Sequence, residues 1–178
     1  GLVCGKVVAL DIDIYDPDIA EVCAQIVVGF SNGQAPVRIG EWPKRLLLFR
    51  CSGEYFNKRA TPYYRIGDQE KNKVEILAKG QMFVAFGIHP GTKGPYEWPQ
   101  KSPLDIGLDG LPPISAEDAD YLTNELSQLV EVQGGVATKG NANTASGRRS
   151  RRNARGTWRS WSRRCASIAR ILRRSLQL

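Results

Sequence analysis

The sequence predicts an α+β fold in which helices pack on a mixed or antiparallel sheet. Short apolar, β-branched runs are typical of buried strands, two longer stretches space apolar residues by three and four, and Gly, Asn and Pro separate them. A chain of 178 residues allows one domain with a tail. Its 42% hydrophobic and 24% charged residues are ordinary for a globular protein, which excludes the collagen-like and wholly disordered classes.

The first third of the chain predicts a strand, a helix and a second strand. Residues 7–14 (VVALDIDI) form an apolar run with two acids near its end. Residues 17–30 place apolar side chains on one helical face, with Asp16 or Asp18 at the start and Ser-Asn-Gly at the end. Residues 45–50 (RLLLFR) predict a second buried strand flanked by basic residues.

The middle of the chain predicts a β-hairpin and a second helix. Residues 67–73 are polar and turn-like, and the runs 73–77 (KVEIL) and 81–88 (QMFVAFGI) are joined by Ala-Lys-Gly, which predicts a hairpin. A Gly- and Pro-rich loop follows, with a short edge strand at 96–98. Residues 115–132 predict a helix that starts at Ser115, with Asp118 three residues on.

The charge and composition divide the chain into three parts. Residues 1–133 are predicted to form the domain, and because the chain starts with Gly inside a strand we expect that domain to be N-terminally incomplete. Residues 134–157 predict a disordered linker. From Arg148 onward there are eleven Arg and no acid; 25 less 11 leaves 14 basic against 18 acidic residues before it, a net charge of −4. Residues 158–178 fit a basic amphipathic helix or out-of-frame translation.

The cysteines and the N-terminus indicate the cellular setting. No signal peptide or apolar span is present, which predicts a cytoplasmic location and no membrane association. The four Cys form no CxxC pair, so we expect reduced thiols rather than a zinc site.

The acids in the first strand carry the chemical hypothesis. Asp11 and Asp13 alternate along the strand, so their side chains share one face about 7 Å apart. Glu75 sits in the middle of the strand 73–77, with the apolar residues on either side facing the opposite way. If the two strands are neighbours, the three carboxylates suit Mg²⁺ or Mn²⁺ and a two-metal nucleotidyl transfer. The alternative is that the acid pair caps the following turn or helix.

Four blocks in this order resemble a known family: VVALDIDIYD, PVRIGEWPKRLLLFR, KVEILAKGQMFVAFGIHP and GPYEW. They resemble the bifunctional DNA primase/polymerase (prim-pol) domain of the archaeo-eukaryotic primase superfamily, found in phage and plasmid replication proteins. The resemblance spans about the first 115 residues. It implies an RRM-like sheet with helices on one side, and it places Asp11, Asp13 and Glu75 on the metal-binding positions.

The resemblance also implies partners: a single-stranded DNA template, nucleoside triphosphates and a replicative helicase, since this chain has no GxxxxGK[ST] loop. Many members of the superfamily place a small-x-His motif between the acidic strands, whereas residues 44–50 contain no His. Basic residues are then candidates for phosphate binding. These candidates are Arg38, Lys44, Arg45 and Arg50, with Lys44 and Arg50 preferred because they flank the apolar strand.

Three further residues each allow two interpretations, one functional and one structural. His89, the only histidine, follows the third acid in a His-Pro pair and is either a phosphate ligand or a structural turn residue. Tyr96 and Trp98 alternate in the presumed edge strand and either stack on a nucleobase or, for Trp98 in particular, pack in the core.

Two other functions stay open at this point. A catalytically inactive nucleic-acid-binding relic would keep the fold and lose the reaction. A metal-dependent nuclease would use the same acids for hydrolysis.

Overall fold

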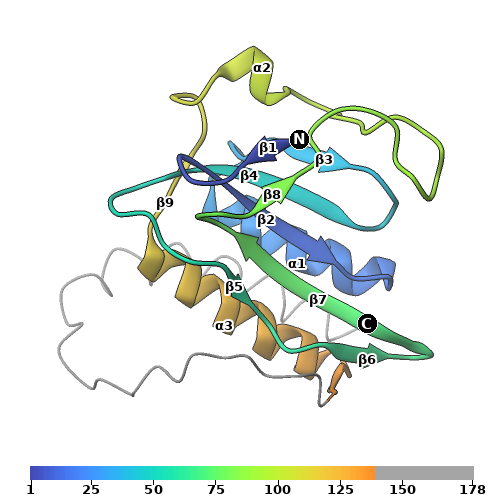
Figure 1. The fold of residues 1–178 in the computed structure, drawn as a ribbon. Coiled ribbons are helices and arrows are strands. Elements are labelled where there is room, and N and C mark those ends of the chain that lie inside the picture. The colour runs from blue at the N-terminus through green and yellow to red at the C-terminus, as the bar shows by residue number, and fades with distance from the viewer. Residues whose placement is uncertain (139–178) are drawn as a thin grey trace, which may run out of the picture. The chain divides into compact units, whose positions relative to one another are not determined.

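The computed structural model describes residues 1–138, and its centre is a largely antiparallel sheet with strand order β10-β6-β7-β2-β4-β3 (Figure 1). β5 pairs with β7 in antiparallel, and β9 pairs with β4 in parallel. A separate two-stranded sheet joins β1 to β8. The strands are β1 (Leu2–Val3), β2 (Val7–Asp13), β3 (Val37–Ile39), β4 (Arg45–Cys51), β5 (Arg59–Ala60), β6 (Tyr64–Ile66), β7 (Gln69–Leu77), β8 (Met82–Phe83), β9 (Pro113–Ile114) and β10 (Val136–Ala137).

Two helices, α1 (Pro17–Phe30) and α3 (Ala116–Val132), pack against the central strands and against each other (Figure 1). The Asp16 side chain accepts a 3.0 Å hydrogen bond from the Ile19 amide and caps α1. A capping box between Ser115 and Asp118 starts α3. A short helix, α2 (Pro103–Ile106), lies in the loop before β9. Among the described residues, no helix has the length and apolar character needed to cross a bilayer.

Alternation along β2 gives the sheet two different faces. Val8, Leu10 and Ile12 are fully buried, as are Phe49 and Leu47, which lie opposite Val8 and Leu10 on β4. These residues form the apolar layer under the helices, because side chains along a strand point alternately to the two faces. Ala9, Asp11 and Asp13 belong to the opposite face.

The face opposite the helices is covered only in part. A second apolar cluster lies over the first half of β2 and includes Ala9 and its β4 neighbour Leu48. Its other buried members are Cys4, Leu46, Leu77, Phe83, Ala85 and Leu111. Asp11 borders this cluster, because it lies opposite Leu46, and Asp13 follows two residues further along β2.

Several predicted elements are confirmed. The helix 17–30 has the predicted bounds, and the helix predicted at 115–132 spans Ala116–Val132 with Ser115 as its N-cap. The strands predicted at 7–14 and 45–50 are each within one residue of β2 and β4. The α+β class is confirmed, with a mostly antiparallel sheet.

The predicted hairpin between 73–77 and 81–88 is wrong. β7 begins at Gln69, inside the segment predicted as a turn, and its hairpin partner is β6, joined through Gly67 at a φ of 55°. β8 pairs with β1 instead. The reason is that β2 occupies one edge of β7 while β5 and β6 occupy the other, so no edge is left for the segment after Leu77.

Two other predictions need adjustment at the edges of the fold. The edge strand predicted at 96–98 is reduced to isolated bridges, one of which joins Glu97 to Ile39. The domain continues past 133, because β10 pairs with β6 and the Thr138 amide donates to the Tyr63 carbonyl at 2.8 Å. The rest of the predicted linker and the Arg-rich segment 158–178 lie outside the described residues.

The described cysteines are free thiols, as expected. Cys4 and Cys23 are buried and Cys51 is partly buried. Burial raises the pKa of Cys23 to about 12 and that of Cys4 to about 11, so both remain protonated and unreactive at neutral pH.

Replacing Leu10 with Ala tests the helix-covered layer. Leu10 is fully buried at the centre of β2, so we expect Leu10→Ala to lower the free energy of unfolding by about 2–5 kcal/mol. Urea denaturation followed by circular dichroism measures it. Val3→Ala removes apolar atoms from a side chain that is 74% exposed and should change stability by less than about 0.5 kcal/mol. Equal losses in both variants would contradict the assigned core.

Candidate functional site

The candidate site is a row of charged side chains on the face of the sheet opposite the helices. β2 and β7 are antiparallel with Asp11 directly opposite Glu75 and Asp13 opposite Lys73. On the other side, Asp11 faces Leu46 of β4, and Leu46 faces Arg38 of β3. Directly opposed side chains on neighbouring strands have Cβ atoms about 5 Å apart. Asp11 and Glu75 are therefore neighbours, with Asp13 on the same face two residues along.

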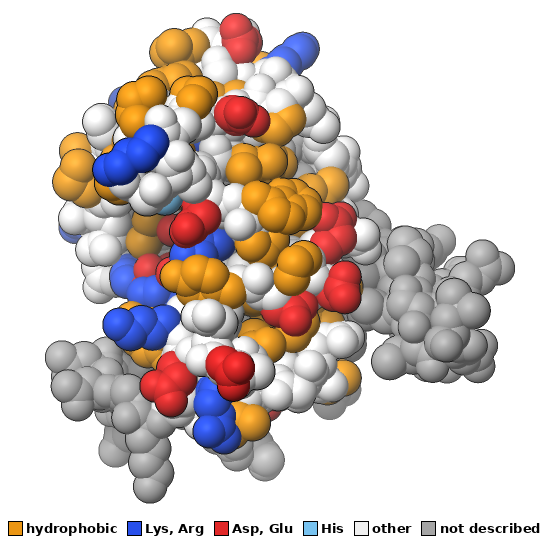
Figure 2. All heavy atoms as spheres, turned by 90° about the vertical axis from the view of Figure 1, so that its right-hand side faces the viewer, with side chains coloured by type: hydrophobic (Ala, Val, Ile, Leu, Met, Phe, Trp, Pro, Cys, Tyr) orange, Lys and Arg blue, Asp and Glu red, His pale blue; other side chains and the backbone are white. Residues whose placement is uncertain are grey.

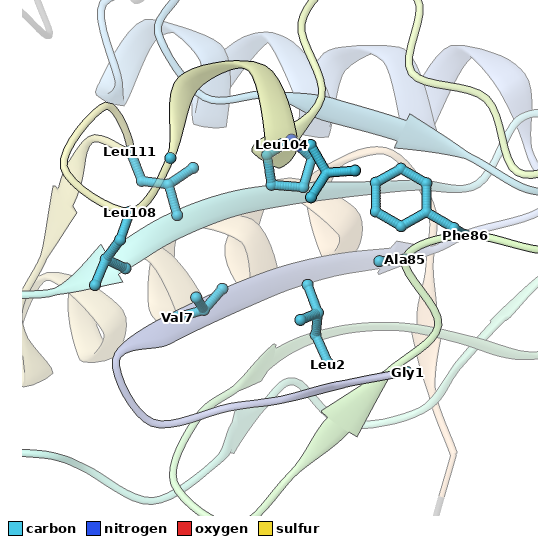
Figure 3. A pocket seen from close by; sticks show the side chains of 10 residues that line it. Gly1, Leu2, Val7, Ala85, Phe86, Leu104, Leu108 and Leu111 are labelled. Atoms are coloured by element: carbon cyan, nitrogen blue, oxygen red, sulfur yellow. The ribbon is translucent and has the colours of Figure 1, made fainter.

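Three lysines neutralise two of the carboxylates. Lys58 Nζ and Lys73 Nζ both contact Glu75 Oε1, at 2.5 and 2.7 Å. Lys44 Nζ lies 3.0 Å from Asp13 Oδ1. Figure 2 views the molecule from the right-hand side of Figure 1 and shows acidic and basic side chains intermixed with apolar ones, not separated into patches of one sign.

Asp11 and Glu75 differ in their electrostatic surroundings. Burial raises the pKa of Asp11 to about 6; the charges of Asp13 and Glu75 act in the same direction, and Arg38 opposes them. Burial also acts to raise the pKa of Glu75, but its hydrogen bonds from Lys58 and Lys73 outweigh that effect and lower it. Neighbouring carboxylates with opposite pKa shifts are common at functional sites. Asp11 is the one that changes charge near neutral pH.

The donor set suits a hard divalent cation, although the described side chains are held by lysines. Asp11, Asp13 and Glu75 offer only carboxylate oxygens, which Mg²⁺ and Mn²⁺ prefer. Among residues 1–138, no group of three or more His, Cys, Asp or Glu side chains is arranged to hold a metal ion. The lysine contacts at Glu75 Oε1 and Asp13 Oδ1 explain part of this, because an ammonium group occupies an oxygen that a metal would need.

Of the four basic residues that the sequence nominated, Lys44 is the one that the structure pairs with a carboxylate of the site. It bridges Asp13 and Glu41, and its Nζ lies 3.6 Å from the centre of the Tyr15 ring. Burial lowers its pKa, but hydrogen bonds to Tyr15, Asp13 and Glu41 outweigh burial and raise it. Lys44 therefore remains cationic at the edge of the site.

Arg38 lies at the β3 end of the charged row. Its Nη1 donates to the Val84 carbonyl, and its guanidinium carbon lies 4.5 Å from the centre of the Tyr96 ring. Its Nε is buried and has no hydrogen-bond partner among the described residues. Burial lowers the pKa of the guanidinium, and the Asp11 charge offsets only part of this effect.

The structure does not bring Arg50 to the carboxylates, although its place beside the apolar strand made it a preferred candidate for phosphate binding. Arg50 faces Val7 at the far end of β2, four residues along β4 from Leu46, or about 13 Å. Arg45 faces the helices and pairs with Glu21 of α1 at 2.5 Å. The reason is strand geometry. Residues that flank an apolar strand lie at its two opposite ends, so they cannot all lie near the same acids.

His89, Tyr96 and Trp98, which allowed a functional or a structural interpretation, all contact other parts of the protein. His89 Nδ1 accepts hydrogen bonds from the amides of Gly91 and Thr92 at 3.2 and 3.1 Å, as a turn residue would. The indole N–H of Trp98 donates to the Ala85 carbonyl at 3.0 Å, and the ring packs against the second apolar cluster. The Tyr96 ring lies against Arg38 and meets the edge of His89 at 5.3 Å.

Sequence reasoning missed Lys58, Lys73, Glu41 and Tyr15. Lys73 could have been found from the sequence, because it lies two residues before Glu75 in the same strand and must therefore share its face. Lys58 gave no signal, since its approach to Glu75 depends on the pairing of β5 with β7.

Comparisons with protein-family models, curated proteins and solved structures returned no match for this chain.

Replacing Asp11 with Asn tests the buried carboxylate. A folded-state pKa of about 6, above the ordinary aspartate value of 3.8, means that Asp11 destabilises the fold increasingly as pH rises from about 4 through 6. Asp11→Asn should then be more stable than the wild type at pH 7.5, by up to about 3 kcal/mol, with the gain vanishing toward pH 4. Urea denaturation at pH 4.5, 6.0 and 7.5 with a chelator measures the difference. A gain independent of pH would contradict the assignment.

Proposed function

We propose that this chain contains the catalytic domain of a DNA primase/polymerase, which joins nucleotides on a single-stranded DNA template in phage or plasmid replication. The observation that carries the proposal is the direct pairing of Asp11 with Glu75, with Asp13 on the same face. The sequence hypothesis required the strand of Glu75 to lie beside the strand of Asp11 and Asp13. Unrelated positions 64 residues apart would not need to meet in this register.

The strand arrangement supports the same proposal. Four neighbouring strands in the order β7-β2-β4-β3, with α1 and α3 against one face, agree with the RRM-like sheet that the prim-pol resemblance implies. In such a sheet the face without helices is free for a substrate. The carboxylates lie on that face next to the apolar cluster, and on this proposal the nucleotide and the template bind over the same face.

Each charged residue has a role in the proposed reaction. Asp11, Asp13 and Glu75 would hold the divalent cations, which supply activation of the attacking 3′-hydroxyl and neutralise the leaving pyrophosphate. Lys44 and Arg38 lie on the side of β2 that faces β4 and β3, and they would act as phosphate ligands for a nucleoside triphosphate. Lys58 and Lys73 hold Glu75 ionised, because their hydrogen bonds outweigh the effect of burial on its pKa.

Nucleotide incorporation tests the proposal. The full chain is incubated with a single-stranded template, with and without a primer, in Mg²⁺ and in Mn²⁺. We expect template-dependent product from the wild type and a loss of at least about a hundredfold for Asp13→Asn and for Glu75→Gln, since each removes an anionic oxygen that a cation requires.

The control is Asp109→Asn, which removes a carboxylate from an exposed loop position and should leave incorporation within about twofold of the wild type. Thermal melting confirms that each variant is folded. A folded wild type without incorporation contradicts the proposal, and release of nucleotides from DNA without added triphosphates would replace it with a nuclease.

A further inference from the structure

The contacts of Tyr96 differ from those of a ring that stacks on a nucleobase. Arg38 lies 4.5 Å from the ring centre, and His89 meets the ring with its edge at an interplanar angle of 75°. The main chain around Tyr96 is held as well. Its amide donates to the Gly87 carbonyl at 2.9 Å, and Glu97 exchanges two backbone hydrogen bonds with Ile39 of β3.

Gly40 makes room for the ring. A Cβ atom at this position would lie 2.5 Å from Tyr96 Cε1 and 2.8 Å from Tyr96 Cδ1, closer than Cβ atoms approach other atoms in proteins. The ring is therefore packed against the backbone directly after β3. Gly40 lies two residues from Arg38, so the same short segment of chain carries both the guanidinium and the space for the ring that supports it.

Arg38 in turn depends on this support. The carbonyl of Val84 accepts from Nη1, and no carboxylate of the described residues lies within salt-bridge distance of the guanidinium. Its Nε is buried without a partner. A guanidinium has five N–H donors, and the Val84 carbonyl is the acceptor that the described residues give this one. The amino groups, and not the buried Nε, are therefore the donors that a ligand would use. A desolvated guanidinium against an aromatic ring is held more strongly than one in water.

We propose that Tyr96 is a positioning residue that holds the Arg38 guanidinium beside Asp11, ready to bind the phosphates of the incoming nucleotide. This inference rests on the proposed function. It replaces base stacking as the role of Tyr96. The phosphate is recognised by Arg38, and Tyr96 acts through it without touching the nucleotide.

The test compares two ligands that share only the phosphate chain: dATP and inorganic tripolyphosphate. Their affinities for the full chain are measured by isothermal titration calorimetry in Mg²⁺ without template, so that no turnover occurs. We expect Tyr96→Leu to weaken both ligands by the same factor, between about threefold and thirtyfold. Tyr96→Phe keeps the ring and should stay within about twofold. A loss confined to dATP would assign Tyr96 to base stacking and overturn the proposal.

A double-mutant cycle separates positioning from an independent contact. Arg38→Gln should weaken both ligands, and Arg38→Gln combined with Tyr96→Leu should be no weaker than Arg38→Gln alone. Losses that multiply would overturn the proposal. Tyr121→Leu, on α3 behind the sheet, is the matched control and should leave both affinities unchanged.

A second readout does not depend on ligand binding. The Nε–H of Arg38, buried against the ring, should give a slowly exchanging NMR signal that is assigned by its loss in Arg38→Gln. We expect the signal to persist in Tyr96→Phe and to disappear in Tyr96→Leu, and an unchanged signal in Tyr96→Leu would overturn the positioning role. A wild type that binds neither ligand would remove the phosphate role together with the proposed function, while the NMR signal still decides the positioning.

Discussion

The pairing of β7 with β2 is the interaction on which the candidate site depends. A slip of one residue would turn Glu75 into the apolar layer under the helices and would turn Val74 and Ile76, which are buried there, toward the acids. The apolar layer under the helices therefore fixes the register of the carboxylates. Buried Asn72 reinforces it: its Oδ1 accepts from the Tyr15 amide and its Nδ2 donates to the Tyr64 and Gln69 carbonyls.

The site also depends on a balance of charge. Asp11 is buried next to two other carboxylates, an arrangement that repulsion and desolvation oppose unless cations lie nearby. Lys44, Lys58 and Lys73 supply those cations by contact, and Arg38 acts on Asp11 through its charge. These contacts offset the repulsion among the three carboxylates.

The sequence predicted those parts of the fold that local patterns determine. The Asp16 and Ser115 caps and the apolar runs of β2 and β4 gave the helices and central strands nearly to the residue. The shared face of Asp11 and Asp13 followed from alternation alone. The hairpin prediction was wrong because a local pattern does not show whether the edges of a strand are already paired. The preference for Arg50 was wrong because its distance from Asp11 depends on the register of β4. The roles of Tyr96 and Lys58 depend on contacts between distant segments, which no local spacing encodes.

The return of the chain through β10 has a consequence for the solubility of this protein. β10 covers the outer side of β6, whose N–H and C=O groups would otherwise face water as an open strand edge. Open edges recruit strands from other molecules and promote aggregation. A shortened protein that stops at 133 would lose this cover, although every carboxylate of the site would be retained. Shortened forms are therefore best ended after Thr138, whose amide closes the last hydrogen bond to Tyr63.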